Sequence, residues 1–347
     1  MSLNSDLFNQ PDNVLISDQF NNRVIETNPR GEIVWSFGLG PNNFTQSSII
    51  GVHDAQRVGK NTLMAGTGIP AGLIPEAPMG VIDNRVILVD KLGNIIWQYG
   101  QFGLSGTGTN LLNAPVQCTF IPCSKMHNHY PLYGSVLITD RGNNRVIEIN
   151  SCRKIIWQYP GPNMIPSDQL SNPNSAQKLC NGHYLIADKS HNRAIEVNKH
   201  HTVTKVFTAN GTLGECTFAS RLHNGNTLLT DSSNNRVVEV DSNDNVVWQY
   251  ITNSEYFSIP LPSPNRSLRL KNGDTLISDQ YNNRVIRVNH LTTIMGYYGL
   301  PIIGGMGPIG PNKGYDVMTT QLGLYSPCDA KIIGDYTGIT NPDSKKH

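Results

Sequence analysis

The chain has 347 residues, and its 27 Lys and Arg nearly balance its 26 Asp and Glu, so the formal net charge is +1. This balance gives no electrostatic case for binding nucleic acid or a membrane surface. No apolar run approaches the roughly 18 residues that a membrane-spanning helix needs. The N-terminal residues have neither the basic start nor the apolar stretch of a signal peptide, so we expect a cytoplasmic protein whose six cysteines are reduced thiols.

One phrase recurs along the chain. It first reads LISDQFNNRVIETNPRGEIVWSFG around Asp18, and it returns in forms such as LITDRGNNRVIEINSCRKIIWQYP and LLTDSSNNRVVEVDSNDNVVWQY. Its arginines are 43 to 62 residues apart, at Arg23, Arg85, Arg145, Arg193, Arg236 and Arg284. A strand-rich repeat of about 40–50 residues is typical of a β-propeller with four-stranded blades. The repeat therefore predicts one closed domain, although the length alone would suggest two or three.

The repeat divides the chain into six blades, whose strands we name a, b, c and d from the axis outward. The N-terminus begins with a strand b, and the missing strand a is matched by SPCDAKII at residues 326–333. We therefore predict an all-β, six-bladed β-propeller in which the C-terminal strand completes the first blade and closes the ring. The predicted blades span residues 12–38 with 326–335, 50–100, 114–160, 172–208, 215–251 and 263–299, and a long insertion follows at 300–326.

Three repeated features are expected to be architectural. In the phrase Asp-x-x-Asn-Asn-Arg, Asn tolerates left-handed φ, and the Asp and Arg can pair to hold the b–c loop. Asn-Gly pairs between strands a and b predict type I′ hairpin turns, in which both residues have positive φ. Four tryptophans share one position in strand d, which predicts packing between blades. These are Trp35, Trp97, Trp157 and Trp248, and the fourth and sixth blades have Lys205 and Gly296 instead.

The repeated phrases resemble those of NHL-type propellers. Units such as RLHNGNTLLTDSSNNRVVEVDSNDNVVWQY are also similar to the repeats of arylsulfotransferase-like and PQQ-repeat-like propellers. The resemblance covers all six blades and implies a six-bladed propeller. It does not select a function, because such repeats carry ligand-binding scaffolds, RNA binders, lyases, hydrolases and sulfotransferases.

Two enzyme classes of this shape imply histidines at the axis. Peptidyl-hydroxyglycine amidating lyases, which this fold resembles, hold a zinc ion with histidines at the start of the inner strands. Arylsulfotransferases need a catalytic histidine with basic partners. Only His53 matches either pattern, which argues against the lyase zinc site and carries over neither activity. The other blades have Val116, Asn174, Thr217, Asn265 and Cys328 at this position.

Loop length favours one face of the ring as the functional face. In a propeller, the d–a and b–c connections leave on one face, and the long segments here are mainly of these two kinds. Binding residues concentrate on loops carried by a rigid scaffold. Segment 300–326 is rich in Gly and Pro, which predicts either a lid over this face or a plug for the axial channel.

The first residues of the inner strands should surround the mouth of this face. Because the first two blades are neighbours, His53, Asp54, Cys328 and Asp329 are expected to cluster, and they are the candidate catalytic residues. Such a set can form a Cys–His nucleophilic pair. It can also hold a divalent metal, through His53, Asp54 and Asp329. The alternative is that these are ordinary polar residues of the mouth.

Basic residues recur deeper in the inner strands, where four of the six fifth positions are cationic. They predict a site for a carboxylate, phosphate or sulfate. The alternative is that each cation pairs with the repeated Asp of a nearby blade. The candidate ligand-binding residues are Arg57, Lys178, Arg221 and Arg269 at the fifth positions, with Arg266, Asn174 and Asn265 nearer the mouth.

The expected function is therefore that of an NHL-like propeller that binds a small anionic molecule or a protein partner on the d–a/b–c face. The alternative is an enzyme with its site at the axial mouth. It would be a metal-assisted hydrolase or lyase, or it would catalyse arylsulfotransferase-like group transfer. An RNA-binding platform fits least well, because the net charge is near neutral and exposed aromatic residues are sparse.

Overall fold

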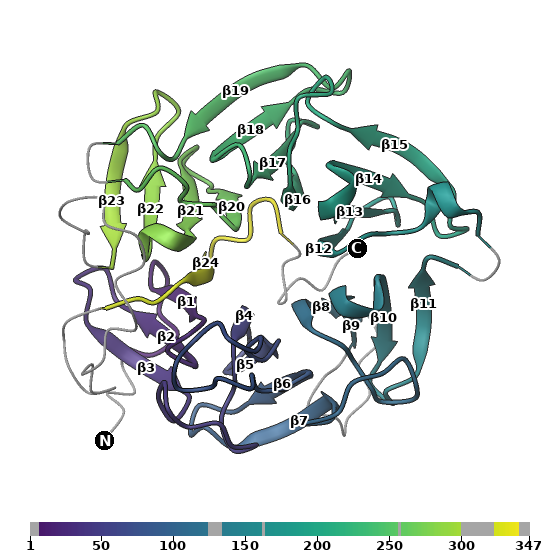
Figure 1. The fold of residues 1–347 in the computed structure, drawn as a ribbon. Coiled ribbons are helices and arrows are strands. Elements are labelled where there is room, and N and C mark those ends of the chain that lie inside the picture. The colour runs from purple at the N-terminus through teal and green to yellow at the C-terminus, as the bar shows by residue number, and fades with distance from the viewer. Residues whose placement is uncertain (1–6, 124–133, 162–163, 256–257, 300–322, 340–347) are drawn as a thin grey trace.

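The computed structural model describes residues 7–123, 134–161, 164–255, 258–299 and 323–339. Six four-stranded antiparallel sheets stand around a common axis in this part of the chain (Figure 1). The predicted six-bladed β-propeller is thus confirmed. The described residues contain four short 3-10 helices, and no helix among them is long and apolar enough to cross a membrane. The 3-10 helices are η1 (Arg141–Asn143), η2 (Pro166–Asp168), η3 (Lys189–His191) and η4 (Gln280–Asn282).

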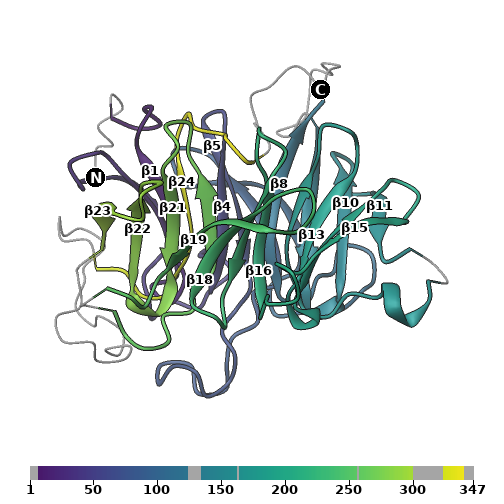
Figure 2. The same ribbon diagram turned by 90° about the horizontal axis from the view of Figure 1, so that it is seen from above.

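Each blade runs from an inner strand a to an outer strand d, and the connections leave at the two ends of the strands (Figure 2). Blade 1 contains β24 (Pro327–Ile332), β1 (Val14–Asp18), β2 (Arg23–Thr27) and β3 (Ile33–Phe37). Blade 2 contains β4 (Val52–Val58), β5 (Asn61–Gly66), β6 (Arg85–Val89) and β7 (Ile95–Gly100). Blade 3 contains β8 (Pro115–Pro122), β9 (Gly134–Asp140), β10 (Arg145–Asn150) and β11 (Ile155–Tyr159). Blade 4 contains β12 (Pro173–Lys178), β13 (Tyr184–Asp188), β14 (Arg193–Val197) and β15 (Val203–Phe207). Blade 5 contains β16 (Cys216–Arg221), β17 (Thr227–Asp231), β18 (Arg236–Val240) and β19 (Val246–Ile251). Blade 6 contains β20 (Arg266–Arg269), β21 (Thr275–Asp279), β22 (Arg284–Val288) and β23 (Ile294–Tyr298).

The C-terminal strand closes the ring as predicted. β24 pairs antiparallel with β1, with Ile332 opposite Val14. Beyond this ladder, the backbone N–H of Asp12 donates to the Ile333 carbonyl at 3.1 Å, and the N–H of Ile333 donates to the Asn13 carbonyl at 2.8 Å. Figure 1 shows the yellow strand lying beside the purple one. Closure leaves β1 without a free inner edge. Of the insertion predicted at 300–326, residues 300–322 lie outside the described residues.

The apolar core lies between blades. Six clusters of buried side chains each join two neighbouring blades around the ring. Trp97 of blade 2, for example, packs in one cluster with Phe120 of blade 3. The Trp35 and Trp248 indole N–H groups donate to the backbone carbonyls of Lys91 and His290, in the c–d turns of the following blades, at 3.1 and 2.9 Å. The predicted packing of the tryptophans between blades is confirmed.

The Asp-x-x-Asn-Asn-Arg phrase holds the b–c loop and binds it to the next blade. In blade 1, Arg23 Nε donates to Asp18 Oδ2 at 2.7 Å, and the equivalent pair forms in blades 3 to 6. In blade 2, Asp83 of the b–c loop takes the place of this Asp and pairs with Arg85. Asn22 has a left-handed φ of 50°, and its Oδ1 accepts the backbone N–H of Gly51 in blade 2 at 2.9 Å. The predicted structural role of the phrase is therefore confirmed.

The a–b hairpins differ from the type I′ turns that the Asn-Gly pairs predict. Only the glycines (Gly182, Gly225 and Gly273) have positive φ, at 79°, 88° and 89°. Gly182 N–H donates to the Leu179 carbonyl, so a turn ends in a left-handed Gly. Asn181 Oδ1 accepts the His183 N–H at 3.0 Å, which ties the Asn to the backbone ahead. The type I′ prediction is wrong because Gly alone supplies the positive φ.

Candidate functional site at the axial mouth

Six residues at or next to the beginning of the inner strands, one from each blade, form a ring around the axis, which we call the mouth ring. It consists of His53, Val116, Asn174, Thr217, Asn265 and Cys328. In blade 2, Val52 lies opposite Gly66 and Asp54 opposite Ala65, so His53 has no partner in β5. The same break in register falls on the ring member in blades 1, 3, 4 and 5. A β-bulge redirects a side chain relative to the regular sheet, so these blades release one residue each from the ladder at the mouth.

The mouth ring converges on the axis. Asn174 of blade 4 and Asn265 of blade 6 are not in adjacent blades, yet Asn174 Nδ2 lies 3.5 Å from Asn265 Oδ1. Each amide also donates to the ring residue of the following blade. Asn174 Nδ2 donates to the Thr217 carbonyl and Asn265 Nδ2 to the Cys328 carbonyl, both at 2.8 Å. These two predicted ligand-binding residues thus lie at the mouth, where their amide N–H groups join neighbouring blades.

His53 is the only imidazole of the ring, and it is 5% exposed. Burial, followed by the positive charges of Arg141 and Arg266, lowers the pKa of His53 well below its usual value near 6.5. The imidazole of His53 is therefore uncharged at neutral pH. Its Nδ1 is buried and has no hydrogen-bond partner among the described residues. Such an atom is uncommon in folded proteins, and it indicates a water or a ligand at this place.

The neutral His53 predicts a specific dependence of stability on pH. In the unfolded chain His53 takes up a proton near pH 6.5, whereas in the folded chain it does not, so the free energy of unfolding falls as the pH drops below that value. We expect wild type to lose about 2 kcal/mol more than His53→Gln between pH 7 and pH 5. Urea unfolding at a series of pH values measures this difference. Parallel curves for the two proteins would show that His53 is protonated when folded.

Cys328 lies beside glutamines of blades 1 and 6. Its Sγ is 3.1 Å from Gln19 Oε1 and 3.5 Å from Gln280 Nε2, and in the described part of the chain its side chain makes no hydrogen bond to His53. Burial raises the pKa of the Cys328 thiol well above its usual value. A nucleophilic cysteine needs to be a thiolate, so this neutral thiol argues against the Cys–His pair that the sequence suggested.

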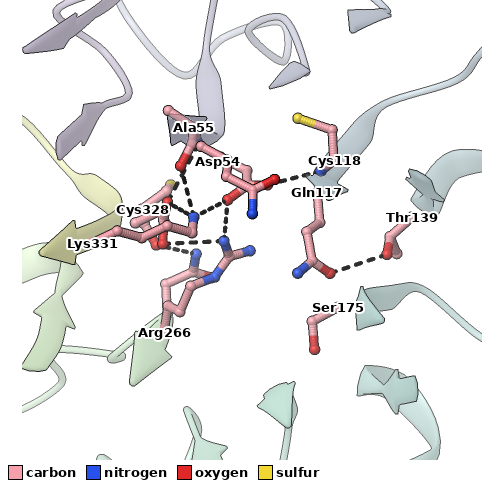
Figure 3. Close-up of polar contacts among 12 residues, drawn as sticks. Asp54, Ala55, Gln117, Cys118, Thr139, Ser175, Arg266, Cys328 and Lys331 are labelled. Carbon is pink, nitrogen blue, oxygen red and sulfur yellow. Dashed lines mark hydrogen bonds and ion pairs between the residues drawn. The ribbon is translucent and has the colours of Figure 1, made fainter. Parts of the chain in front are cut away.

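Asp54 and Asp329 do meet, as predicted, but they meet inside a compact group of charges below the mouth ring. Figure 3 shows Asp54 of this group beside Lys331 and Arg266. Lys331 Nζ lies 2.6 Å from Asp54 Oδ1 and also binds Asp329, while Arg266 Nη1 bonds Asp54 and lies 3.1 Å from Asp329 Oδ1. We call these four residues the axial ion cluster. Although burial raises the pKa of Asp54, the charges of Lys331 and Arg266 hold that pKa well below its usual range. The cluster joins blades 1, 2 and 6 and is neutral as a whole.

The carboxylates of the axial ion cluster also satisfy backbone donors of the inner strands. Asp329 Oδ2 accepts the N–H of Ala55 at 3.3 Å, and Asp54 Oδ2 accepts the N–H of Cys118 at 2.8 Å. Gln117 and Ser175 serve the next two blades in the same way, accepting from Ala176 and Ala219. The second position of the inner strand thus joins each of these blades to the one that follows. Both predicted catalytic aspartates, Asp54 and Asp329, have this structural role.

A metal centre is not assembled by the predicted residues. No group of three or more His, Cys, Asp or Glu side chains within the described ranges is arranged to hold a metal ion. His53, Asp54 and Asp329 therefore do not form one, and the two carboxylates face the ammonium and guanidinium groups of the axial ion cluster instead.

The four cations at the fifth positions lie between blades. Each pairs with a glutamate in strand c of the preceding blade, as Arg57 Nη2 does with Glu26 Oε2 at 2.5 Å. The other pairs are Lys178–Glu148 at 2.8 Å, Arg221–Glu196 at 2.9 Å and Arg269–Glu239 at 2.9 Å. The prediction that the repeated Asp is the partner is wrong. That Asp stands at the far end of strand b, where it already binds the Arg of its own loop.

The residue that follows the repeated Asp was not among the predicted site residues. In five blades this residue is Gln19, Arg141, Lys189, Ser232 or Gln280. Arg141 Nη1 lies 3.5 Å from Asn174 Oδ1 of the mouth ring. Lys189 pairs with Glu215 at 3.1 Å, whereas no carboxylate of the described residues forms an ion pair with Arg141. The signal was available, because this position varies between blades while the Asp, Asn and Arg around it repeat.

Comparisons with known proteins bear on the fold. No family model matches the chain, and no curated protein matches it. A solved protein of unknown function from Bacteroides caccae is similar over 86% of this chain and 97% of its own, with 13% identity and a TM-score of 0.54. A streptogramin B lyase is similar over 83% of this chain and 79% of its own, with 13% identity and a TM-score of 0.52. A catalytically inactive virginiamycin B lyase variant from Staphylococcus aureus, with quinupristin, is similar over 87% of this chain and 89% of its own, with 14% identity and a TM-score of 0.52. These likenesses support a β-propeller, and membership of the NHL or arylsulfotransferase-like families stays a prediction.

Proposed function

We propose that this propeller binds a small anionic molecule at the mouth ring and that Arg141 pairs with the anion. The observation that carries the proposal is the guanidinium of Arg141, which lies beside Asn174 with no carboxylate partner in the described part of the chain. A guanidinium is suited to carboxylate, sulfate and phosphate groups, because its N–H donors match their oxygens in pairs.

The charges around the mouth support an anion over a cation. The axial ion cluster balances two carboxylates against two cations, so it leaves no net negative charge below the ring. Arg141 therefore adds an unbalanced positive charge to this neutral base. Arg266 Nε and Nη2 are also buried, and neither has a hydrogen-bond partner among the described residues. Buried donors without partners favour a ligand that supplies acceptors.

The proposal is tested with a panel of inorganic phosphate, sulfate, small carboxylates and aryl sulfates, the last chosen because the repeats resemble those of arylsulfotransferase-like propellers. We expect at least one anion to bind in calorimetry and to raise the melting temperature. Arg141→Gln should weaken that binding by about tenfold or more, since a charge-assisted hydrogen bond contributes about 1.5–3 kcal/mol.

The matched control is Arg153→Gln. Arg153 is exposed in the c–d turn of the same blade, on the opposite face, so the variant removes the same charge without touching the mouth. If no anion on the panel binds, the proposed function is wrong. If both variants weaken binding equally, the proposed site is wrong, because only the net charge of the protein matters.

A second candidate function, an enzyme at the same mouth, is favoured by one observation. The buried imidazole of His53 has a nitrogen without a partner among the described residues, which leaves that nitrogen free to bind a reacting group of a bound molecule. Mass spectrometry of the same incubations distinguishes the two functions. Turnover that is lost in His53→Gln while binding persists would establish the enzyme, and a ligand recovered unchanged would leave the binding protein.

A further inference from the structure

The interface that closes the ring, between blade 6 and blade 1, lacks the groups that fill the other interfaces. Elsewhere a cation at the fifth position pairs with a strand-c glutamate of the preceding blade, or Phe120 packs in an apolar cluster with Leu88. At the closing interface, the fifth position is Ile332 and the strand-c position is Arg287. Arg287 pairs in the ladder with Gly296, at the position where four other blades have tryptophan. The long cation, the glutamate and the indole are all absent.

A pocket of about 540 Å³ lies at this interface. It is lined by the a–b turn of blade 6 (270–272), by Arg287, by the end of β24 and the residues after it (332–335), and by Pro11 and Asp12. Pro11, Leu270, Ile332 and Ile333 give it apolar walls. A side chain at Gly296 would meet no atom within 4 Å at its Cβ, so the tryptophan position beside Arg287 is open as well. The volume is that of a small-molecule site.

The guanidinium of Arg287 lines this pocket and has donors to spare. Its Nε lies 3.3 Å from Asp274 Oδ2, but it is not oriented to donate a hydrogen bond, and it is buried with no such partner among the described residues. Asp335, one of the two acidic residues in the lining, is already engaged. Its two oxygens accept the backbone N–H groups of Lys271 at 2.7 Å and Thr337 at 3.1 Å.

We propose that this pocket binds a small aromatic carboxylate. The flat apolar ring would lie against Ile332 and Leu270, in space that the long cation and the indole take at other interfaces. The carboxylate would pair with Arg287, which no glutamate or fifth-position side chain binds here. The pocket lies on the a–b/c–d face, so it is separate from the mouth ring and independent of the function proposed for it.

The test uses indole-3-acetate as the probe, with indole-3-acetamide as its uncharged match and tryptophan as its zwitterionic match. We expect indole-3-acetate to bind the full chain and to bind about tenfold or more tightly than the amide. Arg287→Gln should remove that difference, while Arg153→Gln, which removes an exposed charge in the c–d turn of blade 3, should leave it unchanged. Tryptophan binding as tightly as indole-3-acetate would support the same carboxylate contact in a zwitterionic ligand.

A second variant keeps the test independent of the loss of one charge. The double substitution Arg287→Glu with Ile332→Arg restores the ion pair of the other interfaces and fills the pocket, so the variant should fold and bind none of the probes. Circular dichroism and a thermal melt confirm folding. The proposal is overturned if wild type binds none of the three probes at millimolar concentration. It is equally overturned if the folded double variant still binds indole-3-acetate.

Discussion

Deleting residues 326–347 is expected to abolish cooperative folding of the propeller. The deletion removes β24, and with it the ladder on β1 and the groups that Asp329 and Lys331 add to the axial ion cluster. Asp54 and Arg266 would then be buried with incomplete partners, and β1 would become an open edge. These losses are comparable with the whole stability of a domain, about 5–15 kcal/mol. Far-ultraviolet circular dichroism and urea unfolding of the soluble protein measure the effect.

A circular permutant supplies the control for this deletion. Residues 323–339, placed before residue 7 through a short Gly-Ser linker, restore the strand at the other end of the chain. The backbone hydrogen bonds between Asp12, Asn13 and Ile333 show that the two segments lie side by side, so the permutant should fold. A truncated chain that unfolds in one transition at the wild-type urea midpoint would show that ring closure contributes little.

Replacing Arg266 with Met is expected to lower the free energy of unfolding by about 3–5 kcal/mol. Arg266 is 1% exposed and binds both Asp54 and Asp329. Methionine fills part of the volume but leaves two buried carboxylates with Lys331 as their only cation in the axial ion cluster. The cost is that of an uncompensated buried charge. Chemical unfolding at neutral pH, where both carboxylates would otherwise be ionised, measures it.

The control is Arg269→Met, which breaks a similar pair at an interface that water reaches. Arg269 pairs with Glu239 at 2.9 Å, and the two side chains are 11% and 9% exposed. Its loss should be clearly smaller, since partial hydration and the nearby turn relieve the remaining glutamate. Equal losses in the two variants, or an Arg266→Met protein as stable as wild type, would contradict the structural role of the axial ion cluster.

The fold was predictable because each blade repeats the same pattern of strands and turns. Alternating apolar residues and a turn after each strand recur in every blade, and the tryptophan of strand d recurs in four of the six. The unmatched strand at 326–333 fits only the first blade, which lacks an inner strand of its own. The Asp–Arg pair was equally predictable, because both residues flank one short loop. Asp18 and Arg23, for example, belong to one segment of six residues.

The partners of the fifth-position cations were harder to predict because they lie in another blade. The repeated Asp is the most regular acidic residue in the sequence. In the folded blades, however, it is the strand-c glutamate that lies beside the fifth-position cation of the next blade. One clue lay in the sequence. Blade 3 lacks the cation and has Phe120, and blade 2, which precedes it, lacks the glutamate and has Leu88. The two substitutions occur together because charge meets charge, and apolar meets apolar, across one interface.

The candidate site could be predicted only in part. The sequence located the mouth ring, but a β-bulge has no clear signature in a short strand, so the release of His53 from the ladder emerged only from the strand register. The grouping of Asp54 with Asp329 followed from blade order. Their pairing with Lys331 and Arg266 did not, because it depends on how three blades meet at the axis.

The variation of these interface pairs also bears on how the ring assembles. A blade that presents Glu26 recognises a neighbour with Arg57, whereas one that presents Leu88 recognises Phe120 and one that presents Arg287 meets Ile332. A misassembled ring that omitted blade 1 would place Arg287 against Arg57, and one that omitted blade 2 would bury Glu26 against Phe120. Such mismatches cost free energy that the native order does not. The pairs that differ between interfaces thus disfavour some wrong orders of the blades around the axis.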